Sequence, residues 1–358
     1  MRVLICGGGV IGAAIAYFLS RRGVEAIVIE GTGLACAASG KSGGFLALDW
    51  CDGSPLAALA RRSFALHAEL AQQIDGDWGY RRLDTYGGLA RAGGAGIDWL
   101  SPQARRQRRL GSTDSTAQVD PGAFTAALMR AAETHGAVLR ASTVNGIVRD
   151  DGGVRGVLVD GEPVAGDAVV IAMGPWSILA TQWLPLPAVF SLKGHSLIFE
   201  TGSPVPAHAA FVDFQEASGD VQSPELFPRA DGTTYVCAIS SETPMPVDPA
   251  AVVPDPGAID RLADMCRQLS PALGQAPVRA RQACYRPVTR DGLPLIGAIP
   301  GVANAYIATG HSVWGILNAP ATGEAVAELI VDGAARTVDL RPFAPERLPN
   351  FDPTRLRA

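Results

Sequence analysis

The sequence predicts an α/β fold in which a domain built on a parallel sheet is interrupted by an inserted antiparallel sheet. Residues 2–6 form an apolar run, followed at once by a glycine-rich turn and a segment of helical periodicity. Residues 26–30 and 168–172 are apolar on both faces, which is typical of central strands in a parallel sheet. Residues 81–119 and 189–284 instead alternate hydrophobic and polar residues and are rich in proline and glycine, as an antiparallel sheet would be.

The first helices have clear boundaries. One is predicted over Val10–Arg22, where apolar residues recur at helical spacing before Gly23. With its flanking strands it forms a βαβ unit of about thirty residues. A second helix is predicted to begin with Asp120 as N-cap and Pro121 at the first helical position, and to end at Gly136.

The later elements are a meander, a strand and a helix. A strand at 137–141 precedes two strands at 146–149 and 154–159, which flank a short turn and predict an antiparallel meander. Near the C-terminus, Ala305–Thr309 is strand-like and Pro320–Val331 has the pattern of a capped amphipathic helix. His67 and His135 are interpreted as helix-surface residues.

The glycine-rich turn carries the strongest motif of the chain. Gly7, Gly9 and Gly12 spell GxGxxG between a strand and a helix, and Glu30 ends the next strand. Val10 and Ile11, at the start of the helix, are further candidate cofactor residues. In a Rossmann-type fold these glycines allow a tight turn, approach to a pyrophosphate and close helix packing, and the acid binds a ribose hydroxyl. The motif predicts a dinucleotide cofactor but does not distinguish NAD from FAD.

Three further segments favour the longer cofactor, FAD. A second Gly/Ser loop follows the second strand, and a strand ends near Gly174 and Trp176. A turn near the C-terminus precedes a helix, whose N-terminal amides can stabilise negative charge on a reduced flavin. The additional candidate cofactor residues are Ser39, Gly40, Lys41, Ser42, Gly43, Gly44, Val144, Gly174, Trp176, Gly310, His311, Gly315 and Ile316.

Length and composition favour two intertwined domains. Of 358 residues, 47% are hydrophobic and 18% are charged, which allows a large core. We predict that residues 1–80, 120–188 and 285–358 form the FAD-binding domain and that 81–119 and 189–284 form a substrate domain. The net charge of −5 argues against nucleic acid as a partner. We expect no export signal and no membrane span. The cysteines form no CxxC or zinc pattern, so we also expect no metal site and a cytoplasmic location.

These motifs resemble those of the D-amino-acid-oxidase-like (DAO) superfamily of FAD-dependent oxidoreductases, which includes glycine oxidase and sarcosine oxidase. The resemblance spans the chain and is carried by GGGVIG, SGKSGG, GDAVVIAMGPWS, RPVTRDGLPLIG and GHSVWGILNAPATGEAVAELI. A little-characterised branch from plants and fungi is similar over residues 38–71 and 310–323. The resemblance implies oxidation of an amine or amino acid by hydride transfer to the flavin N5. It also implies hydrolysis of the imine and reoxidation of the flavin by O2, giving H2O2, or by another acceptor.

The resemblance also indicates candidate substrate-site residues. Arg286 matches an arginine that pairs with the substrate carboxylate, although an interdomain salt bridge is the alternative. Cys284 matches a cysteine that is bonded to the flavin in sarcosine oxidase; non-covalent FAD and a buried cysteine are the favoured alternative. The other cysteines are interpreted as structural.

Three more residues are candidates for the chemistry. His195 can accept a proton or bind a polar group, and a structural histidine is an equal alternative. Lys193 can favour reaction with oxygen by its positive charge, and Trp314 can form an aromatic wall of the site or belong to the core. Two other functions stay open: oxidation of a 2-hydroxy acid on the same fold, and a flavin-bound protein that acts by binding a partner.

Overall fold

A six-stranded sheet combines strands from both ends of the chain in the computed structural model, which describes the chain except residues 89–96, 103, 105–107, 203–204, 217 and 357–358. Its strand order is β20-β21-β12-β1-β2-β8, and all neighbours are parallel except β20 and β21. The strands are β1 (Arg2–Cys6), β2 (Glu25–Glu30), β8 (Val138–Ala141), β12 (Ala168–Ile171), β20 (Leu295–Ala298) and β21 (Ala305–Thr309). The predicted α/β class is confirmed, and 89–96, 103, 105–107, 203–204 and 217 of the predicted substrate domain lie outside the described residues.

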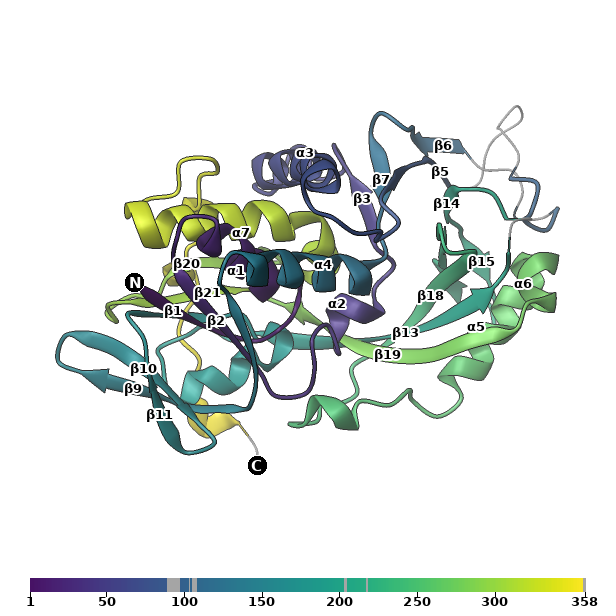
Figure 1. The fold of residues 1–358 in the computed structure, drawn as a ribbon. Coiled ribbons are helices and arrows are strands. Elements are labelled where there is room, and N and C mark those ends of the chain that lie inside the picture. Colours follow the sequence, from purple (N-terminus) through teal and green to yellow (C-terminus); the bar gives the residue numbers. More distant parts are fainter. Residues whose placement is uncertain (89–96, 103, 105–107, 203–204, 217, 357–358) are drawn as a thin grey trace.

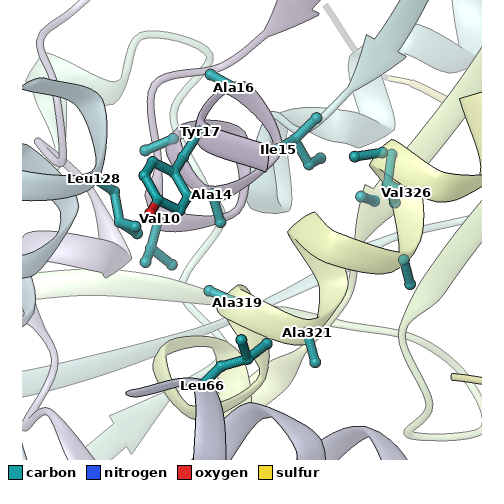
Figure 2. Packing of buried hydrophobic residues seen from close by; sticks show 14 of the residues in the cluster. Val10, Ala14, Ile15, Ala16, Tyr17, Leu66, Leu128, Ala319, Ala321 and Val326 are labelled. Atoms are coloured by element: carbon teal, nitrogen blue, oxygen red, sulfur yellow. The ribbon is translucent and has the colours of Figure 1, made fainter. Parts of the chain in front are cut away.

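One face of this sheet is covered by helices, as Figure 1 shows. They are α1 (Val10–Ser20), α4 (Pro121–Thr134) and α7 (Gly315–Asp332), and α3 (Ala57–Gln73) packs against α7. The α1 helix packs between α4 and α7 through small residues, several of which Figure 2 shows. At Gly323 of α7 a Cβ atom would lie 2.6 Å from the backbone carbon of Ala14, so only glycine permits this helix contact.

The opposite face is covered by an antiparallel meander, as the sequence predicted. It consists of β9 (Val144–Asp150), β10 (Gly153–Val159) and β11 (Glu162–Ala165). Its valines and the 3₁₀ helix η1 (Gly174–Gln182) pack on apolar side chains of β1 and β12. The central parallel strands are therefore buried on both faces, which explains why their sequences are continuously apolar.

A second, seven-stranded sheet has the order β19-β13-β18-β17-β14-β5-β6. The strands are β5 (Asp84–Gly87), β6 (Arg108–Gly111), β13 (Phe190–Glu200), β14 (His208–Phe211), β17 (Glu225–Pro228), β18 (Thr233–Ser241) and β19 (Val278–Val288). One face packs against α5 (Ala258–Leu269) and α6 (Pro271–Gln275) through a separate core. The other carries a smaller cluster that includes Phe45, Phe227 and Tyr235. All neighbours are antiparallel except β5 and β14.

Short elements complete the fold. They are β3 (Phe45–Ala47), β4 (Arg81–Arg82), β7 (Thr116–Gln118), β15 (Phe214–Gln215), β16 (Val221–Gln222) and α2 (Ala38–Lys41). The 3₁₀ helices are η2 (Pro249–Ala251), η3 (Ser312–Trp314), η4 (Arg341–Phe343), η5 (Pro345–Arg347) and η6 (Pro353–Arg355). The domain boundary expected between residues 284 and 285 falls inside the continuous strand β19, and the division into domains stays a prediction.

Two expectations about α7 and α3 were wrong, and for one connected reason. The last helix begins at Gly315 rather than Pro320, because His67 compensates for the missing proline N–H. The His67 Nε2 lies 3.0 Å from the oxygen of Ile316, the carbonyl that Pro320 leaves without a donor, and 3.2 Å from that of Leu317. His67 is therefore fully buried, not on the surface, whereas His135 is exposed as expected.

Candidate active site

A cavity of about 1080 Å³ lies where the ends of β1, β2 and β12 face the seven-stranded sheet. Ligand cavities in proteins range up to about 1,000 Å³, so this one has room for a large cofactor together with a small substrate. The predicted cofactor residues that line it are Gly7, Gly9, Val10, Ile11, Glu30, Ser39, Ser42, Gly43, Val144, Gly174, Trp176, Cys284, His311, Gly315 and Ile316.

The glycine turn has the close backbone contacts that its motif implies. Gly7 has φ +113°, and a Cβ atom there would lie 2.5 Å from the oxygen of Ala172. At Gly12 a Cβ atom would lie 2.1 Å from the oxygen of Gly7. Gly9 is the N-cap of α1 and has no side chain that could cap the first turn, and Val10 and Ile11 at the start of the helix line the cavity. The turn is built to receive an anionic group.

Glu30 lies at the end of β2 and lines the cavity as predicted. One carboxylate oxygen accepts a hydrogen bond of 2.7 Å from the Gly8 amide. The other accepts from the amides of Thr32 at 2.7 Å and Gly33 at 3.1 Å. The carboxylate thus holds the glycine turn against the loop after β2, and its remaining lone pairs can accept from a hydroxyl group.

The predicted second Gly/Ser loop is partly a helical turn, α2. The Ser39 hydroxyl oxygen accepts a hydrogen bond of 2.9 Å from the amide of Val10, which fixes this turn against the start of α1. Lys41 does not line the cavity; its ammonium donates to the oxygen of Ala283 at 3.3 Å. Gly12, Gly40, Gly44 and Gly310 also do not line it, and each lies where a Cβ atom would overlap a neighbouring group.

A second helix N-terminus reaches the cavity through Gly315 and Ile316 of α7. Beside it, burial lowers the pKa of His311 to about 3, so the imidazole is neutral. The His311 Nε2 lies 3.0 Å from the hydroxyl of Thr322, whereas Nδ1 has no partner in the described part of the chain. The buried hydroxyl of Ser42, which lines the cavity too, is equally unsatisfied there. Buried polar atoms of this kind are normally bonded, so both fit a polar ligand.

Arg286 and Cys284 lie on the face of the seven-stranded sheet that borders the cavity. The Arg286 guanidinium forms no hydrogen bond or ion pair with any described residue. The interdomain salt bridge that was its alternative is therefore absent from the described structure. Burial raises the pKa of the Cys284 thiol, and the charges of Arg286 and Lys41 offset part of that rise.

The sequence did not indicate three other residues of this face. Glu225 of β17, and Tyr235 and Cys237 of β18, line the cavity. The Cys237 thiol donates to a carboxylate oxygen of Glu225 at 3.5 Å. From the sequence, Cys237 and Cys36 were interpreted as structural cysteines, but both line the cavity. Alternation along each strand was the available signal, yet it does not show which strands pair or in what register.

Lys193 and His195 lie on the opposite face of the sheet, because side chains alternate along β13. Asp255, just before α5, donates its amide to His195 Nε2 at 3.0 Å, and His195 Nδ1 donates to the oxygen of Ile239 at 3.0 Å. The Lys193 ammonium pairs with the Asp255 carboxylate. His195 borders the cavity, but both its ring nitrogens are bonded elsewhere, so the geometry favours the structural alternative.

Asp255 is the centre of this network. Burial raises its pKa, but hydrogen bonds from Lys193, Ser241 and Thr243 lower it to about 2. The carboxylate is thus ionised and the Lys193 charge is neutralised within the fold. The geometry therefore gives Lys193 no direct access to the cavity. Trp314 does not line the cavity either and packs against the main core, as its alternative interpretation stated.

The fold and the site define a protein that holds a dinucleotide between a Rossmann-type domain and an antiparallel sheet. The chain matches the family model of FAD-dependent oxidoreductases (DAO) over residues 2–329, so it belongs to this family of enzymes. This match confirms the resemblance inferred from the motifs. In the described part of the chain, no helix combines the length and apolarity that a membrane crossing requires.

Similar proteins cover nearly the whole chain. A candidate oxidoreductase of Schizosaccharomyces pombe is 30% identical over 96% of this chain and 97% of its own length. The glycine oxidase of Geobacillus kaustophilus is 28% identical over 96% of this chain and 97% of its own length. The crystal structure of glycine oxidase from that organism superposes with a TM-score of 0.82 and 26% identity, covering 96% of this chain and 98% of the other.

The residues of the cavity fit FAD. The turn at Gly7–Gly9 and the α1 N-terminus suit a pyrophosphate, and Glu30 suits a ribose hydroxyl. The α7 N-terminus and the unsatisfied Nδ1 of His311 suit the polar edge of a flavin ring. Bound FAD supplies a two-electron acceptor, and the protein supplies binding, orientation and electrostatics.

Proposed function

We propose that this enzyme oxidises the carbon–nitrogen bond of a small carboxylated amine, such as an amino acid. The bond is oxidised by hydride transfer to the flavin N5, water hydrolyses the imine, and O2 reoxidises the flavin to give H2O2. The observation that carries the proposal is the guanidinium of Arg286, which borders the cavity without a partner in the described structure. The relatives named glycine oxidase support the substrate class.

Arg286 supplies binding and orientation. A guanidinium holds a carboxylate by two parallel hydrogen bonds, which fixes the position of the adjoining Cα–H bond. Cys284, two residues earlier, lies on the same face of β19 and also lines the cavity. A substrate held at Arg286 therefore lies in the part of the cavity bordered by the antiparallel sheet.

The protein's remaining task is to hold the flavin and exclude water. The apolar walls include Ile29, Leu179 and Ile316, which restrict solvent around the reacting groups. We propose that FAD is bound non-covalently. Support comes from the raised pKa of the Cys284 thiol, because a protonated thiol is a poor nucleophile.

The test is a substrate panel on the purified flavoprotein under anaerobic conditions. Amino acids and N-methyl amino acids are compared with the corresponding 2-hydroxy acids, and loss of the oxidised flavin absorbance is followed. We expect amino compounds alone to reduce the flavin and the reaction in air to produce peroxide. Reduction by hydroxy acids alone would refute oxidation of a carbon–nitrogen bond.

A further inference from the structure

Glu225 introduces a negative charge into the part of the cavity that holds Arg286. Both side chains extend from the same face of the seven-stranded sheet, on β17 and β19, with β18 and β13 between them. Glu225 pairs in register with Cys237, which pairs with Ser196, and alternation places Cys284 and Arg286 on that face too. The face therefore presents a carboxyl group and a guanidinium to the same cavity.

The two charged groups influence each other but form no direct bond. No ion pair or hydrogen bond connects Glu225 to Arg286, and the only hydrogen-bond partner of the Glu225 carboxyl group among the described residues is the weak thiol donor of Cys237. Burial raises the pKa of Glu225, and the positive charge of Arg286 offsets part of that rise. Each group is therefore available to a ligand that enters between them.

A zwitterion satisfies both groups at once. Its carboxylate pairs with Arg286, and its cationic nitrogen replaces the charge that stabilised Glu225 as an anion. A carboxylate with a neutral tail pairs with Arg286 but leaves Glu225 either ionised without a partner or protonated. Buried carboxylates of this kind are costly unless paired.

We propose that Glu225 binds the cationic nitrogen of the substrate, so that the enzyme selects amino acids and N-alkyl amino acids over carboxylates without a positive charge. This inference rests on the proposed function, since it takes Arg286 as the carboxylate site. In this proposal Arg286 and Glu225 together select the substrate class, and Glu225 is the residue that determines specificity for a positively charged nitrogen.

The experiment measures binding without turnover. Isothermal titration calorimetry of the flavoprotein compares glycine betaine with tert-butylacetate, which has the same shape but carbon in place of nitrogen. Betaine cannot form an imine because its nitrogen has no lone pair. The wild-type protein is expected to bind betaine more tightly by about 30-fold or more, the usual minimum for a buried charge pair.

Glu225→Gln is expected to remove this preference while leaving the affinity for tert-butylacetate unchanged or higher. Glu225→Asp, which keeps the charge, retains a preference for betaine, and Glu162→Gln, at an exposed carboxylate of β11, behaves as wild type. Arg286→Ala weakens both ligands.

Three results would overturn the inference, and two of them leave the proposed function intact. Equal binding of both ligands by the wild type, or an unchanged preference in Glu225→Gln, would exclude Glu225 as the cation site while Arg286 still binds carboxylates. Failure of both ligands to bind to the wild type, with no effect of Arg286→Ala, would remove the carboxylate site itself.

Discussion

Replacing Arg286 with alanine separates substrate binding from stability. The guanidinium makes no ion pair or hydrogen bond with the described residues, so its removal breaks no such bond in the folded protein. The melting temperature is therefore expected to stay the same or to rise. Truncating one member of a buried charge pair costs about 2 to 5 kcal/mol of binding free energy, which corresponds to a rise in KM of about 30-fold to about 4000-fold.

The assay compares Arg286→Ala with the wild type and with Arg290→Ala, an exposed arginine four residues later. Steady-state kinetics with a carboxylated amine give KM and kcat, and thermal unfolding of the flavoprotein gives the melting temperature. Arg286→Lys is expected to recover part of the affinity, since lysine keeps the charge but not the two-pronged geometry. An unchanged KM, or a fall in melting temperature with normal kinetics, would refute the assignment and favour a structural role.

Three further predictions concern Gly12, Ser39 and the buried His67. Gly12→Ala places a methyl group 2.1 Å from the oxygen of Gly7, so we expect loss of flavin in the purified protein. Gly274→Ala, where the nearest atom is 3.6 Å away, should keep its flavin; equal flavin in both would contradict the contact. Ser39→Ala removes the acceptor of the Val10 amide and should cost about 1 to 2 kcal/mol in urea unfolding, and no loss would contradict the role of this bond. Burial lowers the pKa of His67 to about 4, below its ordinary 6.5. Above about pH 6.5 the imidazole is neutral in both the folded and the unfolded state, so it causes no dependence of stability on pH there. Below this pH the unfolded state takes up a proton that the folded state does not, and the free energy of unfolding falls by about 3 kcal/mol as the pH decreases towards 4. His67→Gln should have a shallower loss than the wild type in unfolding measured across that range, and an identical slope would exclude His67.

The cofactor half of the site could be predicted because its chemistry is local. Gly7, Gly9 and Gly12 lie within six residues, and the strand, turn and helix that give them meaning are contiguous in the chain. Glu30 follows in the next strand at the spacing that the βαβ unit fixes. A short motif therefore indicated both the backbone geometry and the kind of cofactor that this geometry binds.

The substrate half could be predicted only in part, because it depends on strand pairing over long distances. Arg286 was found by resemblance, whereas Glu225 requires knowledge that β17 pairs with β18 and β18 with β13. The same lack of register led to Lys193 and His195 being considered for the chemistry, although alternation turns both towards α5. A one-residue shift in register reverses the faces of a strand, so sequence alone did not decide these residues.

His67 shows a second limit of local reasoning. Its helix pattern did not reveal that α7 contains a proline whose missing N–H must be replaced by a donor from another helix. His67 Nε2 supplies that donor at Ile316, and the Ser63 hydroxyl accepts from the amide of Ala321 at 3.0 Å. Because the sequence predicted that the helix begins at Pro320, where a missing N–H costs no hydrogen bond, it did not indicate that a donor some 250 positions earlier is needed.

The most direct test of the central claim is the visible absorption spectrum of the purified protein, repeated on the supernatant and the pellet after acid precipitation. The site described here predicts the bands of oxidised flavin, released into the supernatant as non-covalent FAD. Yellow colour retained in the pellet would contradict the non-covalent assignment and indicate Cys284 as the point of attachment. Folded protein without a flavin spectrum, and without one after addition of FAD, would contradict the claim that this cavity binds a flavin.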